Sequence, residues 1–368
     1  MQNQEEKMKL AFTPYAIKSL CCKNRLMRSA TWEAKATENG HMTSALYKVY
    51  EMLAKNEAGL ICTGMTRITE EECANEKMLG IYDDSFMEEY KHLTQMVHSH
   101  GAKIMMQVAY GGTKTTYKTE NRNIFAPSDV PEKITGTQGV SMMQSDIAYV
   151  VQSHGQAARR VKEAGFDAIE LHAAHFYLLN QFLSPYYNRR TDQYGGELEN
   201  RVRFLKECYE EVRKVVGQDF PIFVKLPCSD FMEGGFTFSE FRQVCQWMDS
   251  WGVDAVEITG NNYTQCGSLI GKVLEGHAIQ KDGYFAEFAK ALPQPEHMHI
   301  FVTGGFCTLE SIENLLTHEK ITGIGIARPF FTEPDLAVQW KENDKKQVKC
   351  IRCGRCRTIH GNGCTVFC

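Results

Sequence analysis

The sequence carries no excess of positive charge. Among its 368 residues, 41 lysines and arginines stand against 45 aspartates and glutamates, which gives a formal net charge of −4. Nucleic acids and anionic membrane surfaces are bound through clustered basic side chains that neutralise phosphates. The charge balance therefore predicts neither a nucleic-acid partner nor a membrane partner.

Long apolar runs are also missing. No run approaches the roughly 20 residues that a membrane-crossing helix needs. The polar start MQNQEEKMKL lacks the apolar core of a secretory signal, so we expect a cytoplasmic protein. In that compartment, the nine cysteines scattered before residue 345, of 14 in all, are expected to be reduced thiols and not a disulfide framework.

One α/β period runs along the chain, without a Pro/Gly/Ser-rich linker. Short apolar runs predict strands at 25–30, 59–64, 103–109, 168–173, 222–227, 255–260, 300–305 and 323–328. Amphipathic segments predict helices at 43–57, 84–99, 145–164, 198–216, 238–250, 283–291, 308–316 and 334–342. Eight strand–helix units describe a single-domain (β/α)8 TIM barrel over residues 1–345, followed by a cysteine-rich tail over 346–368. A doubly wound sheet is the competing α/β arrangement, but no GxGxxG follows the first strand to favour it.

Polar residues mark the C-terminal ends of three predicted strands. Gln107, His172 and Lys225 alternate with apolar neighbours and lie on the face expected to point into the barrel. Because active sites of such barrels form at the C-terminal mouth, these are candidate site residues. The alternative is that they only close the barrel with internal hydrogen bonds. The long connection 111–142 follows Gln107 and is predicted to form a lid or a substrate wall.

The loops after the last two strands, VTGGF and GIGIARPF, predict a phosphate site. In barrels these loops often bind phosphate, because backbone N–H groups without bulky side chains can approach the anion. Gly304, Gly305, Ala327 and Arg328 fit that role. Glycines that merely form tight turns are the alternative.

Two histidines and a tyrosine follow the fourth strand in ELHAAHFYLLNQF. His172, His175 and Tyr177 could be metal ligands, buried core residues or a catalytic group. A zinc site lacks support, because residues at a strand end do not share a helix face and no HExxH pattern is present. A core role would account for one imidazole, but not for two beside a phenol at a barrel mouth.

The stretch HAAHFYLLNQFLSPYYNRRTDQYGGELENRVRFL is similar to the signature of the old yellow enzyme family of FMN-dependent ene-reductases, which are (β/α)8 barrels. The likeness extends over residues 10–340, including KNRLMRSA, TGGF and the final Ala-Arg. The chain departs from the family pattern at Phe176, usually glycine, and at Glu197, usually serine. It also has Trp32 where a threonine or cysteine is usual.

The resemblance implies that FMN lies across the barrel mouth. Gln107 would bind the pyrimidine edge of the flavin. Lys225, where many members have arginine, would place positive charge near flavin N1 and O2. The residues implied to contact the cofactor, from ring to phosphate, are Ala30, Thr31, Gly64, Gln107, Lys225, Gly304, Gly305, Ala327 and Arg328.

The resemblance also implies an activity. His172 and His175 would bind the carbonyl oxygen of an electron-poor alkene, Tyr177 would donate a proton, and NAD(P)H would be the reductant. The expected partners are the nicotinamide, an enone or enoate substrate and, in a homo-oligomer, a second copy of the chain. Two alternatives stay open: an FMN/iron–sulfur reductase related to dienoyl-CoA reductases, and a non-catalytic FMN electron-transfer module.

Five cysteines crowd into the tail sequence KCIRCGRCRTIHGNGCTVFC. The CxxCxxC run with a distant cysteine resembles the iron–sulfur motif of dienoyl-CoA reductases and trimethylamine dehydrogenases. Thiolates at this spacing can hold three corners of a 4Fe–4S cluster, with a fourth supplied from further along. The implied ligands are Cys350, Cys353, Cys356 and Cys368. Zinc, or a reduced or partly oxidised tail without metal, are the alternatives.

Overall fold

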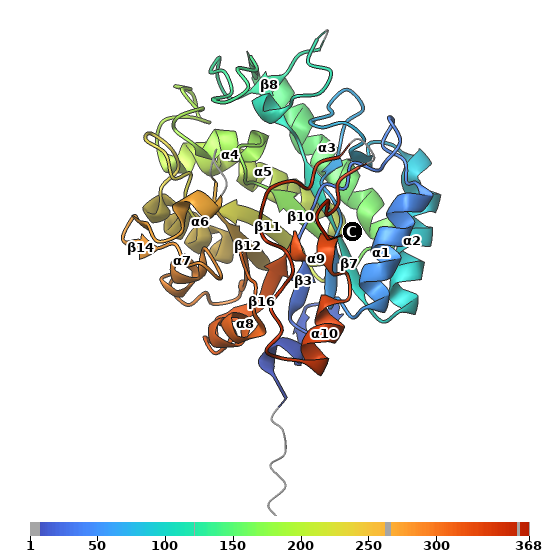
Figure 1. Ribbon diagram of the computed structural model, residues 1–368. Coiled ribbons are helices and arrows are strands. Elements are labelled where there is room, and N and C mark those ends of the chain that lie inside the picture. Colours follow the sequence, from blue (N-terminus) through green and yellow to red (C-terminus); the bar gives the residue numbers. More distant parts are fainter. Residues whose placement is uncertain (1–7, 121, 262–265, 359–360, 368) are drawn as a thin grey trace, which may run out of the picture.

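Eight parallel strands close into a barrel in the computed structural model, which describes residues 8–120, 122–261, 266–358 and 361–367 (Figure 1). The strands pair in sequence order, and β16 pairs back with β3. The predicted barrel is therefore confirmed. The strands are β3 Leu26–Arg28, β4 Leu60–Cys62, β7 Lys103–Ala109, β10 Ala168–His172, β11 Ile222–Pro227, β12 Ala255–Thr259, β15 His299–Thr303 and β16 Ile321–Ile326.

A ring of helices surrounds the barrel (Figure 1). Thr43, Thr237 and Thr308 begin three of them by accepting a hydrogen bond from the backbone N–H three residues on. None of the helices in the described ranges combines the length and apolar composition that a bilayer span requires. The helices that fill predicted positions are α1 Ser44–Lys55, α2 Met87–Ser99, α3 Gln144–Glu163, α5 Leu198–Val216, α6 Phe238–Trp251, α7 Ala286–Lys290, α8 Leu309–Leu316 and α10 Leu336–Glu342.

Short elements in the connections were not predicted, because a few residues carry no readable periodicity. An antiparallel hairpin of β1 and β2 packs against the N-terminal ends of the barrel strands and closes that end. Two further strands, β5 and β6, extend the sheet beside β7. The added elements are β1 Tyr15–Ile17, β2 Leu20–Cys22, β5 Thr66–Arg67, β6 Leu79–Gly80, β8 Phe125–Ala126, β9 Val140–Ser141, α4 Leu178–Leu183, β13 Val273–Leu274, β14 His277–Ala278 and α9 Pro329–Thr332.

Side chains fill the barrel interior in layers. Near the closed end the layer is apolar and contains Met27, Leu60, Met105, Ala168, Phe223, Ala255 and Phe301. Inward-facing positions recur every second residue, so the next layer lies two residues further along each strand. That layer is polar and buried, and contains Ser29, Cys62, Gln107, Glu170, Lys225, Glu257 and Thr303. The predicted inward orientation of Gln107 and Lys225 is thereby confirmed.

The segment after β10 turns sharply before α4. His175 and Phe176 both adopt left-handed backbone conformations, with φ of 59° and 62°, a region that favours glycine. Here the Phe176 N–H donates to Asn180 Oδ1 at 2.7 Å, and its carbonyl accepts from Gln181 Nε2 at 2.8 Å. The following loop is held by Arg201, which donates to the carbonyls of Leu183 and Gly196.

Candidate active site

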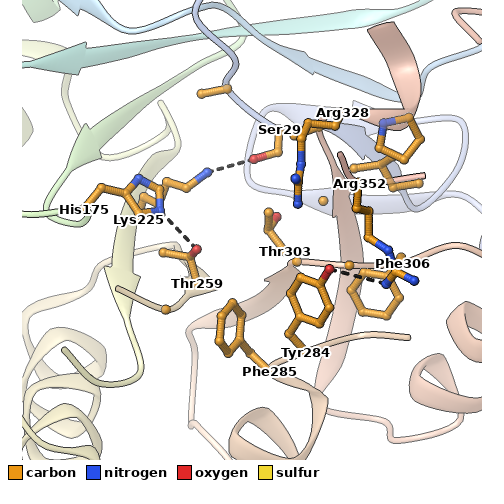
Figure 2. Close-up of a pocket in the computed structure, with 18 of the residues that line it drawn as sticks. Ser29, His175, Lys225, Thr259, Tyr284, Phe285, Thr303, Phe306, Arg328 and Arg352 are labelled. Atoms are coloured by element: carbon orange, nitrogen blue, oxygen red, sulfur yellow. Dashed lines mark hydrogen bonds between the residues drawn. The ribbon is translucent and has the colours of Figure 1, made fainter. Parts of the chain in front are cut away.

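A cavity of about 380 Å³ lies at the C-terminal ends of the barrel strands (Figure 2). Lys225 and His175 lie on one side of it, and Arg328 and Arg352 on the other (Figure 2). Lys114, from the long connection after β7, completes part of the wall. The predicted site residues that line this cavity are Ala30, His175, Lys225, Gly304, Gly305, Ala327 and Arg328.

The side with Arg328 is built for an anion. Gly305 has a φ of 76°, and a Cβ atom there would lie 2.5 Å from the ring of Tyr284, so only glycine fits. Arg352, which comes from the tail, donates to Tyr284 Oη at 3.3 Å and to the Lys281 carbonyl at 2.6 Å. The guanidinium groups of Arg328 and Arg352 lie beside glycine backbone at Gly304 and Gly305, where no side chain blocks the approach of an anion. This arrangement suits a phosphate group.

The opposite side carries a fixed positive charge. Lys225 Nζ donates to Ser29 Oγ at 2.8 Å and to Glu257 Oε1 at 2.9 Å. Burial alone would lower the pKa of Lys225, but the nearby carboxyl groups of Glu257 and Glu170 outweigh it and raise that pKa. Lys225 is therefore an ammonium group at neutral pH.

Three predicted cofactor contacts lie beside the cavity and not on its wall. Gln107 is buried and donates from Nε2 to Glu170 Oε2 at 2.6 Å. Thr31 Oγ1 donates to the Ser29 carbonyl at 2.9 Å. A Cβ atom on Gly64 would lie 2.9 Å from the Thr31 carbonyl oxygen, so here the glycine makes room for the segment after β3.

The indole of Trp32 makes its contacts within the protein. Its indole Nε1 donates to the Glu76 carbonyl at 3.1 Å, and the guanidinium of Arg357 lies 5.3 Å from its ring centroid. A threonine or cysteine at position 32 has no aromatic ring and could not make this cation–π contact with Arg357 of the tail.

The two histidines and the tyrosine form one cluster. The His172 ring centroid lies 5.2 Å from that of His175 and 4.9 Å from that of Tyr177. His175 Nε2 contacts Thr259 Oγ1 at 3.2 Å, whereas the buried His172 Nδ1 has no hydrogen-bond partner among the described residues. His172 and Tyr177 do not line the cavity, whereas His175 does; a buried imidazole nitrogen without a partner is uncommon and calls for one that the described residues do not supply.

Electrostatics keep both imidazoles neutral. Burial, with the charge of Lys225 adding to it, lowers the pKa of His175 to about 3. Burial, the neighbouring His175 and Lys225 hold the pKa of His172 well below its usual range. At neutral pH each ring therefore carries a single N–H donor.

Sequence reasoning missed Asn75, which touches the predicted proton donor. Asn75 is buried in the connection between β5 and β6, and its Nδ2 donates to Tyr177 Oη at 3.2 Å. Burial raises the pKa of Tyr177 to about 12, and this hydrogen bond acts against the rise. Nothing in the sequence around Asn75 marks it, because the contact joins positions 102 residues apart.

The C-terminal tail folds back onto the segment after β3. Asn362 Nδ2 donates to the Trp32 carbonyl at 2.7 Å, and the Asn362 backbone N–H donates to the Glu33 carbonyl at 2.6 Å. Cys350 lines the main cavity as well as a smaller neighbouring one. The cysteines that line this smaller cavity are Cys350, Cys353, Cys356 and Cys364.

The tail geometry leaves the metal prediction untested. Within the described ranges, no three histidine, cysteine or acidic side chains are arranged as a metal site. Cys368, implied as the fourth cluster ligand, lies outside the described residues. Among the described cysteines, no disulfide bond joins Cys350, Cys353 or Cys356 to another cysteine.

Together, the barrel and its mouth define a class of protein: a (β/α)8 barrel with an anion-binding cavity at the C-terminal ends of its strands. A model of the NADH:flavin oxidoreductase / NADH oxidase family matches residues 10–347. The chain belongs to this family. FMN is the family's cofactor, and the arginines and Gly305 at one side of the cavity and Lys225 at the other fit its phosphate and its ring.

Individual relatives agree with the family assignment. A metal reductase of Desulforamulus reducens is 33% identical over 350 residues, covering 95% of this chain and 51% of the relative. The structure of 2-naphthoyl-CoA reductase in complex with 2-naphthoyl-CoA has a TM-score of 0.83 at 23% identity, covering 90% of this chain and 52% of that one. An old yellow enzyme homologue from Zymomonas mobilis has a TM-score of 0.77 at 23% identity, with 93% and 95% covered. This chain thus spans about half the length of the first two proteins.

We predict that Arg328→Ala weakens FMN retention. A charge-assisted contact to phosphate contributes on the order of 1.5–3 kcal/mol, so the dissociation constant of FMN should rise roughly 10- to 100-fold. Equilibrium titration of the FMN-free full chain, followed by flavin fluorescence, measures this. Arg242→Ala on α6, which does not line the cavity, is the control and should leave the constant unchanged. An equally tight Arg328→Ala complex would place the phosphate elsewhere.

Proposed function

We propose that this chain uses NAD(P)H to reduce the C=C bond of α,β-unsaturated carbonyl compounds. The observation that carries the proposal is the buried, unpartnered Nδ1 of His172 beside His175 and Tyr177. Bound FMN would supply the redox chemistry, taking two electrons from the nicotinamide and delivering a hydride to the β carbon.

The neutral imidazoles would bind the substrate's carbonyl oxygen. During alkene reduction negative charge develops on this oxygen, and hydrogen-bond donors aimed at it lower the barrier. His172 offers an unpartnered ring nitrogen for this contact. The ring of His175 is oriented by Thr259, and the backbone N–H of His175 donates to Asn261 Oδ1 at 2.6 Å. Binding and orienting the carbonyl is therefore the role proposed for the pair.

Tyr177 would protonate the α carbon. Its phenol oxygen accepts a hydrogen bond from Asn75, which leaves the O–H proton free to point at a substrate. The same amide donor would stabilise the phenolate that remains after transfer. A non-catalytic FMN module that only relays electrons would have no use for this arrangement, which favours an enzyme.

An FMN/iron–sulfur reductase is the second candidate. It is favoured by Cys350, which lines the cofactor cavity, and by the four cysteines that surround the small cavity next to it. A cluster at this place would adjoin the flavin site and could pass electrons to or from it.

We predict that His172→Ala slows alkene reduction roughly 100-fold and raises the dissociation constants of carbonyl ligands, since one donor to the developing oxyanion is lost. Stopped-flow mixing of reduced protein with 2-cyclohexenone measures both. Because both histidines stay neutral, binding of this ligand to the wild type should be flat from about pH 5 to 8. His318→Ala, an exposed histidine, is the control. If ligand binding instead changed between about pH 5 and 8, and this change disappeared in His172→Ala, the two histidines would not be neutral donors.

We predict that Tyr177→Phe separates the two half-reactions. Flavin reduction by NAD(P)H and carbonyl binding should persist, while alkene reduction falls about 100- to 10,000-fold, the usual effect of losing a general acid. The two steps are followed separately by flavin absorbance. Tyr186→Phe, in the same segment, should leave both rates unchanged. Slower flavin reduction with normal alkene turnover would rule out Tyr177 as the proton donor.

The tail cysteines give a prediction that distinguishes the two candidates. If the protein carries a cluster, anaerobically purified full-length chain contains iron and shows broad visible absorbance beyond that of the flavin. The double change Cys353→Ala/Cys356→Ala should then remove both signals, whereas Cys21→Ala, on the exposed hairpin, should retain them. Iron-free protein with full NAD(P)H-driven alkene reduction would reject the iron–sulfur candidate.

A further inference from the structure

Three ionisable side chains meet inside the barrel, directly below the cofactor cavity. Glu170, Lys225 and Glu257 project inward from the neighbouring strands β10, β11 and β12, and their side chains are 0%, 3% and 0% exposed. Lys225 pairs in register with Glu257. Charged groups buried this deeply must find partners, because isolated charges are strongly unfavourable there.

One oxygen of each carboxyl group has clear donors. Glu257 Oε1 accepts from Lys225 Nζ at 2.9 Å, from Ser29 Oγ at 2.5 Å and from Thr303. Glu170 Oε2 accepts from Gln107 Nε2 at 2.6 Å. Each carboxyl group thus holds a side chain predicted to contact the flavin: Glu257 holds Lys225, and Glu170 holds Gln107.

The remaining oxygens of the two carboxyl groups have no such donors. Glu170 Oε1 and Glu257 Oε2 are buried and accept no hydrogen bond from other described residues. Both carboxyl groups project into the same buried layer of the barrel, from β10 and β12. Two ionised carboxylates would repel each other in this buried layer, whereas one proton shared by the pair would satisfy both orphaned oxygens.

The surroundings decide which glutamate keeps the proton. Glu257 faces the Lys225 ammonium and two hydroxyl donors, which favour its ionised form. Glu170 accepts hydrogen bonds from the neutral amide of Gln107 and the thiol of Cys62 on β4, at 3.6 Å, and the charge of Lys225 acts on it without a hydrogen bond between them. Burial and then the charge of Glu257 raise the pKa of Glu170 well above its ordinary value, whereas Lys225 and the hydroxyls hold that of Glu257 below it despite burial.

We propose that Glu170 and Glu257 form a positioning pair that shares one proton, held on Glu170, and that fixes Gln107 and Lys225 beneath the flavin. The Lys225 charge is then already balanced by Glu257. The flavin meets a site with no net charge at this layer, so its midpoint potential depends on the carboxylate as much as on the ammonium group. This inference rests on FMN binding and not on the alkene reduction proposed above.

Two variants test the charge assignment in the FMN-loaded full chain. Glu170→Gln replaces a neutral acid with a neutral amide of the same shape, which can still donate to Glu257. It should leave the midpoint potential and FMN content unchanged. The double variant Glu170→Gln/Glu257→Gln removes the carboxylate of the pair and leaves the charge of Lys225 unbalanced. The midpoint potential of the flavin should then become more positive, because positive charge stabilises the reduced flavin.

Two further measurements read the proton directly. In the infrared difference spectrum between the wild type and Glu170→Gln, one carbonyl band of a buried carboxylic acid should be lost, while any band from the buried Glu72 is common to both proteins and cancels. The raised pKa also has a stability consequence: the folded chain keeps a proton that the unfolded chain releases above its ordinary pKa of 4.5. The wild type should therefore lose stability relative to Glu170→Gln as the pH rises from about 5 to 8.

The outcomes separate cleanly. A Glu170→Gln protein with a shifted potential, or a difference spectrum without the acid band, would overturn the assignment of the proton to Glu170. A double variant with the wild-type potential would show that Glu257 does not balance Lys225. Should the double variant fail to fold, the infrared band and the pH dependence of Glu170→Gln still decide the matter. Failure of alkene reduction would leave all these measurements in place.

Discussion

The inside of the barrel has to be filled, and the site at its mouth depends on how this is done. Eight short strands place their inward side chains in layers, and the lowest layer is closed with aromatic and aliphatic groups such as Phe223 and Phe301. This apolar floor keeps water away from the layer above. Lys225 in that layer therefore needs a fixed counter-charge, and Glu257 supplies it from the adjacent strand.

The architecture could be predicted from the sequence because every barrel strand is a short apolar run followed by an amphipathic helix. The alternation within each strand also assigned faces correctly. The same parity also places Glu257 inside the barrel: it lies two residues after the inward-facing Ala255, as Lys225 lies two residues after Phe223. A charged residue at an inward position of an apolar strand is a signal in its own right.

Other parts of the site leave no local trace in the sequence. Asn75 lies in an irregular connection, and its contact with Tyr177 exists only because β7 and β10 are neighbours in the barrel. Arg352 follows the segment matched by the family, yet it lines the cofactor cavity. Such contacts join residues far apart in the sequence and form only in the folded barrel. Periodicity and short motifs, which describe neighbouring residues, cannot predict them.

The docking of the tail has a thermodynamic consequence. Cys350 and Arg352 form part of the cavity wall, and Asn362 fastens the same tail to the segment after β3. A ligand that contacts this wall binds only the docked arrangement fully, so ligand binding and tail docking are linked equilibria. Each must strengthen the other by the same factor. A change that weakens tail docking, such as oxidation of its cysteines, would therefore lower the affinity of the cavity for the cofactor, although no residue of the barrel is altered.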